Sequence, residues 1–166
     1  VDDRAGRDPD DHPFLVISAD IHTDFDLGRA STIALQMDAG GHSCWCVMVR
    51  NPAHHGGGDF RLEGGRLSLP PRPAERGSGS DAGSGADAGS DSEAGSGADA
   101  TRTLTYAGIG LFRPRLFRDI APGTKQALRP VLERELAAGR AAGERHDGEW
   151  FDIGTPQRLM ELDRRL

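Results

Sequence analysis

Two short apolar stretches of the sequence end on aspartates, whose carboxylates can hold a hard metal ion. The stretch FLVISAD places Asp20 after an apolar run, and EWFD places Asp152 after another. Ligands of open α/β sheets bind at the carboxyl ends of the strands. Two carboxylates that meet there repel each other unless a cation joins them, and Mg²⁺ binds one or two carboxylates together with substrate phosphates. The pair predicts either a metal-dependent phosphoryl-transfer site or, more simply, two strand ends or helix caps.

Two further aspartates, Asp24 and Asp26, follow the first stretch as Asp-x-Asp. This pattern resembles the metal motif of nucleotide-sugar glycosyltransferases, which is the alternative enzyme class. Asp26 also stands immediately before a helical pattern, where it could cap the helix without any metal. His54 and His55 are adjacent in NPAHHGG and are expected in a loop, because neighbouring side chains on a strand point apart.

The elements that would position these residues alternate between strands and helices. The run 14–19 predicts a buried strand, and a helix capped by Asp26 and ended by Gly40 and Gly41 follows it. A second buried strand is predicted at 44–50, which makes a βαβ unit and a parallel sheet. Beyond it we expect two short strands around Gly64 and Gly65 and a longer strand at 103–112. A helix from Pro130 to Gly139 and a strand at 144–154 follow. The last element is a helix with Thr155 as its N-cap and with Leu159 and Leu162 as its apolar stripe.

The length of 166 residues predicts about one domain, interrupted by an insert. Residues 77–100 contain only Gly, Ser, Asp, Ala and one Glu, so they have nothing large to bury and are predicted to be disordered. The domain is therefore expected over 13–76 and 101–166, with 1–12 as a polar tail or loop.

The charge balance outside the insert is nearly neutral. The chain has 26 acidic and 20 basic residues, and the insert holds five of the acidic ones and no basic one. Nothing in the sequence has the basic character of a nucleic-acid-binding protein. No apolar run approaches the roughly 18 residues of a membrane span, and no signal peptide is evident.

Cys44 and Cys46 are expected on one face of a strand in a structural role, because two thiols alone cannot complete a zinc site. A reducing cytoplasm is the simplest setting for them.

Four segments resemble the sugar-1-phosphate nucleotidyltransferases in the order expected of that family. They are FLVISADIHTDFDLGRA, NPAHHGGGDFRLEGGRL, LTYAGIGLFRPRLF and GEWFDIGTPQRLMELD. The resemblance covers roughly 13–75 and 102–166, and WFDIGTP followed by a helix is its most specific part. The nearest branches are the bacterial N-acetylmuramate α-1-phosphate uridylyltransferases and proteins like mannose-1-phosphate guanylyltransferase.

The resemblance implies an α/β fold with a Rossmann-like (GT-A-like) sheet. It also implies an enzyme that transfers a nucleotidyl group, uridylyl in the nearest branch, from a nucleoside triphosphate to a sugar 1-phosphate in cell-wall recycling or nucleotide-sugar synthesis. By resemblance, Asp20 and Asp152 are the Mg²⁺ ligands and catalytic residues. Gly108 corresponds to the strand beside the sugar, where a glycine lets a backbone approach a ligand closely. Glu144 would bind sugar hydroxyls, and Lys125, in a stretch similar to the family's Lys-x-x-Leu, would bind a phosphate; a solvated surface lysine is the simpler interpretation of Lys125.

The sequence departs from the family pattern in two places. Ala19 precedes Asp20 where the family has glycine, which leaves a methyl group near the site. The family's N-terminal Gly-rich loop, which holds the triphosphate and the base, has no counterpart in the 166 residues. We therefore expect the chain to be the C-terminal portion of an enzyme and to have little activity without an N-terminal half. The alternative is that the chain is a non-catalytic fragment or subunit.

Overall fold

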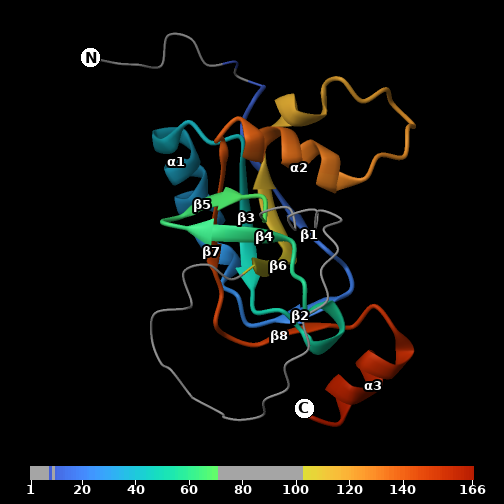
Figure 1. Cartoon of the computed structure of the whole chain (residues 1–166). Coiled ribbons are helices and arrows are strands. Elements are labelled where there is room, and N and C mark those ends of the chain that lie inside the picture. The colour runs from blue at the N-terminus through green and yellow to red at the C-terminus, as the bar shows by residue number, and fades with distance from the viewer. Residues whose placement is uncertain (1–7, 9, 71–102) are drawn as a thin grey trace, which may run out of the picture.

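The computed structural model describes residues 8, 10–70 and 103–166 (Figure 1). The predicted insert at 77–100 and most of the predicted tail lie outside these residues. No helix in the described part of the chain is long and apolar enough to span a lipid bilayer.

A mixed six-stranded sheet forms the centre of the fold, with the strand order β1-β6-β3-β7-β5-β4. Strand β6 is antiparallel to both β1 and β3, whereas β7 is parallel to β3. The α/β prediction is confirmed, but the expected parallel sheet is wrong, because β3–β7 is the single parallel pair among the described strands of this sheet. The two strands of the expected βαβ unit, β1 and β3, run in the same direction, but β6 lies between them. The strands are β1 (Phe14–Ile17), β3 (Cys44–Val49), β4 (Phe60–Glu63), β5 (Arg66–Ser68), β6 (Thr103–Phe112) and β7 (Ala141–Arg145).

A second, two-stranded sheet pairs β2 (Ile21–Thr23) with β8 (Trp150–Asp152) in antiparallel register. It lies beyond one end of the main sheet, next to the C-terminal helix (Figure 1). Within the described ranges, the helices are α1 (Ala30–Gly40), α2 (Leu128–Ala137) and α3 (Pro156–Asp163), and the 3₁₀ turns are η1 (Leu27–Arg29), η2 (Ala53–His55) and η4 (Pro114–Phe117).

Helices α1 and α2 cover opposite faces of the main sheet. Strand β3 contributes Cys44, Cys46 and Met48 to the core on the α2 side, and Val47 and Val49 to the core on the α1 side. This alternation follows from the two-residue period of a strand. Both cysteines are fully buried, free thiols on one face of β3, as predicted.

Several boundaries confirm the local signals in the sequence. The carboxylate of Asp26 accepts a hydrogen bond of 2.9 Å from the backbone N–H of Gly28 and so caps η1. Gly41 ends α1 with a φ of 66°. Gly64 and Gly65 form the turn between β4 and β5 with φ values of 55° and 80°, which only glycine adopts readily.

The exposure of β1 contradicts the prediction of a buried strand. Its four residues, Phe14 to Ile17, are between 36% and 44% exposed. Strand β1 is the edge of the sheet and pairs only with β6 among the described strands, so its other long side has no partner strand there. The ring of Phe14 packs against that of Phe117 in η4, with centroids 5.9 Å apart.

Two predictions in the C-terminal region are also wrong. The expected strand at 144–154 is interrupted, because β7 pairs with β3 in the main sheet whereas β8 pairs with β2 in the second sheet. In α3, Leu162 is buried but Leu159 is 51% exposed, so the apolar stripe is narrower than expected.

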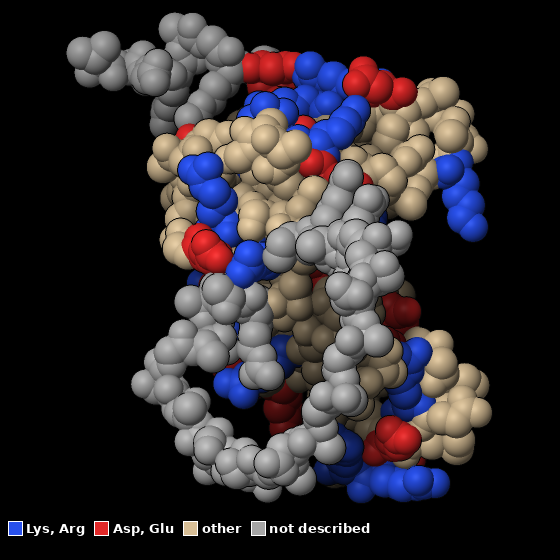
Figure 2. Space-filling model, viewed as in Figure 1, with Lys and Arg blue, Asp and Glu red and all other residues tan. Residues whose placement is uncertain are grey.

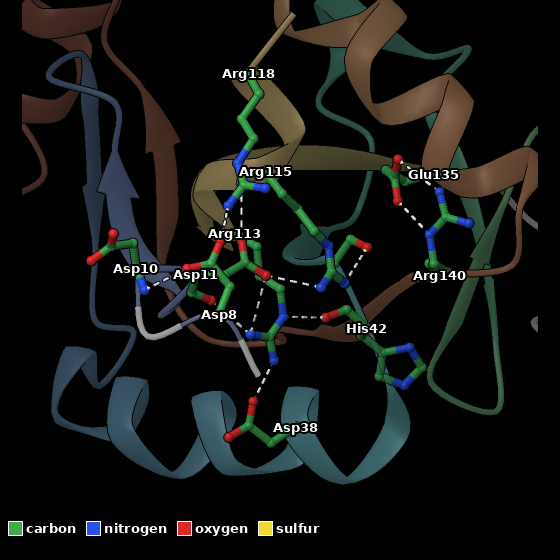
Figure 3. A network of polar contacts seen from close by, with 11 residues as sticks. Asp8, Asp10, Asp11, Asp38, His42, Arg113, Arg115, Arg118, Glu135 and Arg140 are labelled. Carbon is green, nitrogen blue, oxygen red and sulfur yellow. Dashed lines mark hydrogen bonds and ion pairs between the residues drawn. The ribbon is translucent and has the colours of Figure 1, made fainter. Parts of the chain in front are cut away.

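A network of aspartates and arginines fixes the first described residues to the rest of the fold (Figure 3). Asp11 is buried; its backbone oxygen accepts a hydrogen bond of 2.8 Å from Nη1 of Arg113, and its carboxylate accepts one of 2.9 Å from Nη1 of Arg115. Arg113 also pairs with Asp38 of α1. In the space-filling view, basic and acidic side chains lie next to one another at this end of the molecule (Figure 2).

Candidate active site

The second sheet brings Asp20 and Asp152 to the same place. Asp20 directly precedes β2 and Asp152 ends β8, and Ile21 lies opposite Asp152 in the register. The backbone N–H of Ile153 donates a hydrogen bond of 2.8 Å to the backbone oxygen of Asp20. The two aspartates therefore meet across a short antiparallel pair, not at the ends of neighbouring parallel strands as the sequence predicted.

Gly154 shows how closely the two carboxylates approach. A Cβ atom built on Gly154 would lie 3.0 Å from Oδ2 of Asp20 and 3.1 Å from Oδ1 of Asp152. Both oxygens thus flank one point, which a side chain on residue 154 would fill.

A cavity of about 430 Å³, the aspartate cleft, opens beside this point. Residues 105–108 of β6 form one wall, and Trp150 of β8 closes another by donating a hydrogen bond of 2.9 Å from Nε1 to the backbone oxygen of Ala107. Cavities of roughly 300–1,000 Å³ hold small molecules, so the cleft is large enough for a sugar phosphate.

Gly108, predicted to lie beside the sugar, lines the aspartate cleft. Its φ is 78°, and a Cβ there would lie 2.7 Å from Oγ and 2.8 Å from Cβ of Ser18. The backbone N–H of Ser18 also donates a hydrogen bond of 2.8 Å to the oxygen of Gly108. The structure therefore requires glycine here for the backbone and for Ser18, independently of any ligand.

Three groups contact the carboxylate of Asp152. Its Oδ1 accepts a hydrogen bond of 2.9 Å from the backbone N–H of Gly154, and its Oδ2 lies 2.6 Å from Nη1 of Arg158 and 3.1 Å from Nε2 of His54. Burial would raise the pKa of Asp152, but the Gly154 N–H, the charge of Arg158 and the contact with His54 together lower it. The carboxylate is thus kept ionised.

Helix α3 positions Arg158. Thr155, the predicted N-cap, accepts hydrogen bonds at its Oγ1 from the backbone N–H and from Nε of Arg158, at 3.3 and 3.2 Å. Arg158 was not among the residues predicted from the sequence. The cap itself could have pointed to it, because an N-cap at 155 places residue 158 in the first turn, next to the strand that ends at Asp152.

His54, expected in a loop, lies in η2 and lines the aspartate cleft. Nothing in the sequence near His54 indicated this contact, because its partners are 98 and 104 residues away. His55 also lines the cleft and lies 3.3 Å from the carboxylate of Asp59.

Glu144 and Lys125 are not among the residues that line the aspartate cleft. Glu144 is in β7, and its carboxylate accepts a hydrogen bond of 2.7 Å from Arg29. Lys125 is exposed in the segment before α2.

The Asp-x-Asp pair is divided between two different roles. Asp26 caps η1, as the simpler interpretation predicted, and Asp24 lies 2.8 Å from Nε2 of His146. Neither lines the aspartate cleft.

The donor set of the aspartate cleft suits a metal ion only when a bound ligand supplies further oxygens. In the described part of the chain, no group of three or more His, Cys, Asp or Glu side chains converges into a metal site made by protein alone. Two carboxylates flanking the Gly154 position are the donor set that Mg²⁺ uses when phosphate oxygens supply further ligands.

No family model matches the chain. A curated relative, the N-acetylmuramate α-1-phosphate uridylyltransferase of Neisseria meningitidis serogroup B, is 33% identical over 153 residues, which cover 90% of this chain and 53% of that protein.

Two solved structures share the fold at 13% sequence identity. One is a Bacillus anthracis protein assigned as a glucose-1-phosphate thymidylyltransferase, in complex with sucrose, with a TM-score of 0.58 and coverage of 95% of this chain and 55% of that one. The other is HddC of Yersinia pseudotuberculosis, with a TM-score of 0.56 and coverage of 93% and 55%. The resemblance found in the sequence is thereby confirmed: the chain is a homologue of the sugar-1-phosphate nucleotidyltransferases and spans about half the length of the curated relative it matches.

Proposed function

We propose that this chain provides the metal-holding and sugar-phosphate-binding part of an enzyme that transfers a nucleotidyl group from a nucleoside triphosphate to a sugar 1-phosphate. The observation that carries the proposal is the approach of Asp20 and Asp152 on either side of the Gly154 position. The relatedness to the Neisseria uridylyltransferase supports the reaction class.

In the proposed reaction, an oxygen of the sugar phosphate attacks the α-phosphorus of the triphosphate and pyrophosphate leaves. Asp20 and Asp152 would hold Mg²⁺, which neutralises the charge that develops on the phosphoryl oxygens. The residues of this chain would orient the reactants: the Gly154 N–H and Arg158 fix the Asp152 carboxylate, and β6 with Gly108 forms a wall of the cleft against which the sugar would lie. Glu144 and Lys125 do not line the aspartate cleft, so the proposed reaction is stated without a contact from either residue.

The nucleotidyl group and the sugar are proposed from the curated relative. We propose a uridylyl group and N-acetylmuramate 1-phosphate, so that the product would be a nucleotide sugar of cell-wall recycling. The two buried free thiols suit a reducing compartment, and we propose the cytoplasm.

Turnover is proposed only together with a nucleotide-binding region. The matched residues cover 53% of the relative, and the sequence pattern of the family's nucleotide loop, Gly-x-Gly-x-Arg, does not occur in the 166 residues. We propose that this region is the N-terminal half of the working enzyme.

The test uses a chimera that joins the nucleotide-binding region of the Neisseria relative to this chain. With Mg²⁺, UTP and N-acetylmuramate α-1-phosphate, the chimera should release pyrophosphate and form UDP-sugar, whereas the 166-residue chain alone should show negligible turnover. GTP and dTTP, each offered in place of UTP, report the preferred base. Asp20→Asn and Asp152→Asn should lower turnover more than affinity for the sugar phosphate, because the charge interaction they remove is strongest in the transition state.

Three results would contradict the proposal. Robust turnover by the chain alone would show that the nucleotide-binding region is dispensable. A folded chimera without turnover would favour a non-catalytic role. Normal turnover in Asp20→Asn, with Mg²⁺ dependence abolished by Asp26→Ala, would favour the glycosyltransferase alternative.

A further inference from the structure

One of the three guanidinium nitrogens of Arg158, Nη2, has no partner among the described residues and faces the carboxylates of Asp20 and Asp152. Its Nε donates to Oγ1 of Thr155 at 3.2 Å, and its Nη1 donates to Oδ2 of Asp152 at 2.6 Å. Among the described residues, Nη2 donates no hydrogen bond and makes no ion pair. Two fixed nitrogens hold the guanidinium plane in place, so the direction of Nη2 is also fixed.

Nη2 points toward the same place as the two carboxylates. The position of a Cβ on Gly154 would be 3.8 Å from Nη2 of Arg158, 3.0 Å from Oδ2 of Asp20 and 3.1 Å from Oδ1 of Asp152. The carboxylate of Asp20 likewise makes no hydrogen bond or ion pair with any described residue. An unpaired donor and an unpaired acceptor therefore face one point in the aspartate cleft.

This combination selects a particular ligand chemistry. A bare anion would be repelled by the two carboxylates, and a bare cation would be repelled by the guanidinium. A phosphate carrying a divalent cation satisfies both groups, because the cation faces the carboxylates and a phosphoryl oxygen faces the guanidinium. Arginine also matches phosphate geometry better than lysine does.

We propose that Nη2 of Arg158 donates a hydrogen bond to a phosphoryl oxygen of the substrate held between Asp20 and Asp152. This inference rests on the proposed function and adds to it the residue that contacts the phosphate. The phosphate is either that of the sugar 1-phosphate or one belonging to the triphosphate and released in pyrophosphate.

A merely positional role for Arg158 makes a different prediction. If Arg158 only oriented Asp152, its loss would weaken binding of the cation and of the phosphate together. If Nη2 binds phosphate, its loss should weaken phosphate binding while the affinity for a bare cation stays the same or rises, since a nearby positive charge has been removed.

The experiment uses the 166-residue chain and its Arg158→Gln and Arg158→Lys variants. Arg164→Gln is the matched control, because Arg164 is exposed at the end of the same helix and carries the same charge. Binding of Mn²⁺ is followed by electron paramagnetic resonance. Binding of pyrophosphate and, separately, of N-acetylmuramate α-1-phosphate is followed by amide NMR shifts, with and without Mg²⁺.

We expect Arg158→Gln to raise the Kd of one of the two phosphate compounds about tenfold, while the Kd of Mn²⁺ does not rise. Arg158→Lys should recover part of the loss, and Arg164→Gln should behave as the wild type. The compound affected identifies which phosphate Arg158 contacts.

The proposal is overturned if Arg158→Gln leaves both phosphate compounds bound as before, if it weakens Mn²⁺ and phosphate equally, or if the wild type binds neither phosphate compound. Failure of the metal site gives a separate result. If the wild type and Arg158→Gln both fail to bind Mn²⁺, the metal-dependent function falls and the role of Arg158 falls with it, whereas Mn²⁺ binding with unchanged phosphate affinities overturns the role of Arg158 alone.

Discussion

At the scale of single residues, the aspartates of the FLVISADIHTDFD segment differ in what their carboxylates contact. The carboxylate of Asp26 caps η1 through the backbone N–H of Gly28, whereas that of Asp20 contacts no described residue through a hydrogen bond or ion pair. A carboxylate with no structural contact, next to a second one that is kept ionised, is what a ligand-binding role requires.

Asp26→Ala should therefore lower the free energy of unfolding by about 0.5–2 kcal/mol, the usual cost of losing an N-cap. Asp20→Asn should change it by less than about 0.5 kcal/mol, because its side chain is exposed and unpaired. Urea denaturation of the 166-residue chain measures both values. A larger loss in Asp20→Asn than in Asp26→Ala would mean that Asp20 serves the fold.

Alanine substitutions at Gly108 and Gly64 distinguish two effects on stability, backbone strain and a side-chain clash. Both have a positive φ, but a Cβ on Gly64 would meet nothing within 4 Å, whereas one on Gly108 would meet Ser18. Gly64→Ala should cost about 1–2 kcal/mol of backbone strain. Gly108→Ala should cost at least about 1 kcal/mol more, because of the clash.

Ser18→Gly in the Gly108→Ala background is the control, and it should recover the difference between the two alanine variants in the same denaturation experiment. Equal losses in Gly108→Ala and Gly64→Ala would show that Ser18 moves aside at no cost.

At the scale of elements, the connection from α2 to β7 carries an ion pair between the buried Glu135 and the exposed Arg140. Nε and Nη2 of Arg140 donate to the two carboxylate oxygens of Glu135 at 2.8 and 3.1 Å (Figure 3). Burial raises the pKa of Glu135, but the hydrogen bonds from Arg140 and Ser43 and the charges of Arg140 and Arg115 outweigh it, so the pKa is lower than usual. The folded state therefore binds this proton more weakly than the unfolded state does.

A lowered pKa stabilises the fold above the pKa of the unfolded state, and this contribution disappears as the pH falls through the folded pKa. Glu135→Gln should thus reduce stability at neutral pH, and its unfolding free energy should fall less between about pH 7 and pH 3 than that of the wild type. Urea denaturation at several pH values gives both curves. Parallel curves would mean that Glu135 contributes nothing to the acid sensitivity.

The sequence predicted most elements that are defined by neighbouring residues. Gly41, Thr155 and the Gly64–Gly65 turn act locally, through backbone conformation and capping, and each was found where expected. The division of 144–154 was missed because it depends on two distant partners, β3 and β2. The contacts of Asp152 with His54 were missed for the same reason: they join segments 98 residues apart.

At the scale of the whole molecule, β1 leaves four apolar residues exposed at a sheet edge (Figure 1). Unpaired backbone groups on an apolar edge strand are a template for pairing with another chain. The 166-residue chain should therefore self-associate as its concentration rises, and Val16→Lys should reduce this association by placing a charge on the edge.

Light scattering coupled to gel filtration measures the effect over a range of concentrations. Leu35→Lys is the matched control, because Leu35 is a single exposed apolar residue on α1, at 69% exposure, and should leave the association unchanged. A chain that stays monomeric at every concentration would show that the edge is protected in solution.

The pairing of β2 with β8 has a consequence for the order of folding. It joins segments about 130 residues apart, so its formation closes a loop that contains nearly the whole main sheet, and contacts of such long range form slowly. The pairing has only three residue pairs, so it should also be among the first parts of the native structure to open transiently. A folding intermediate with a complete main sheet would then hold Asp20 and Asp152 apart, and the aspartate cleft would appear only in the last step.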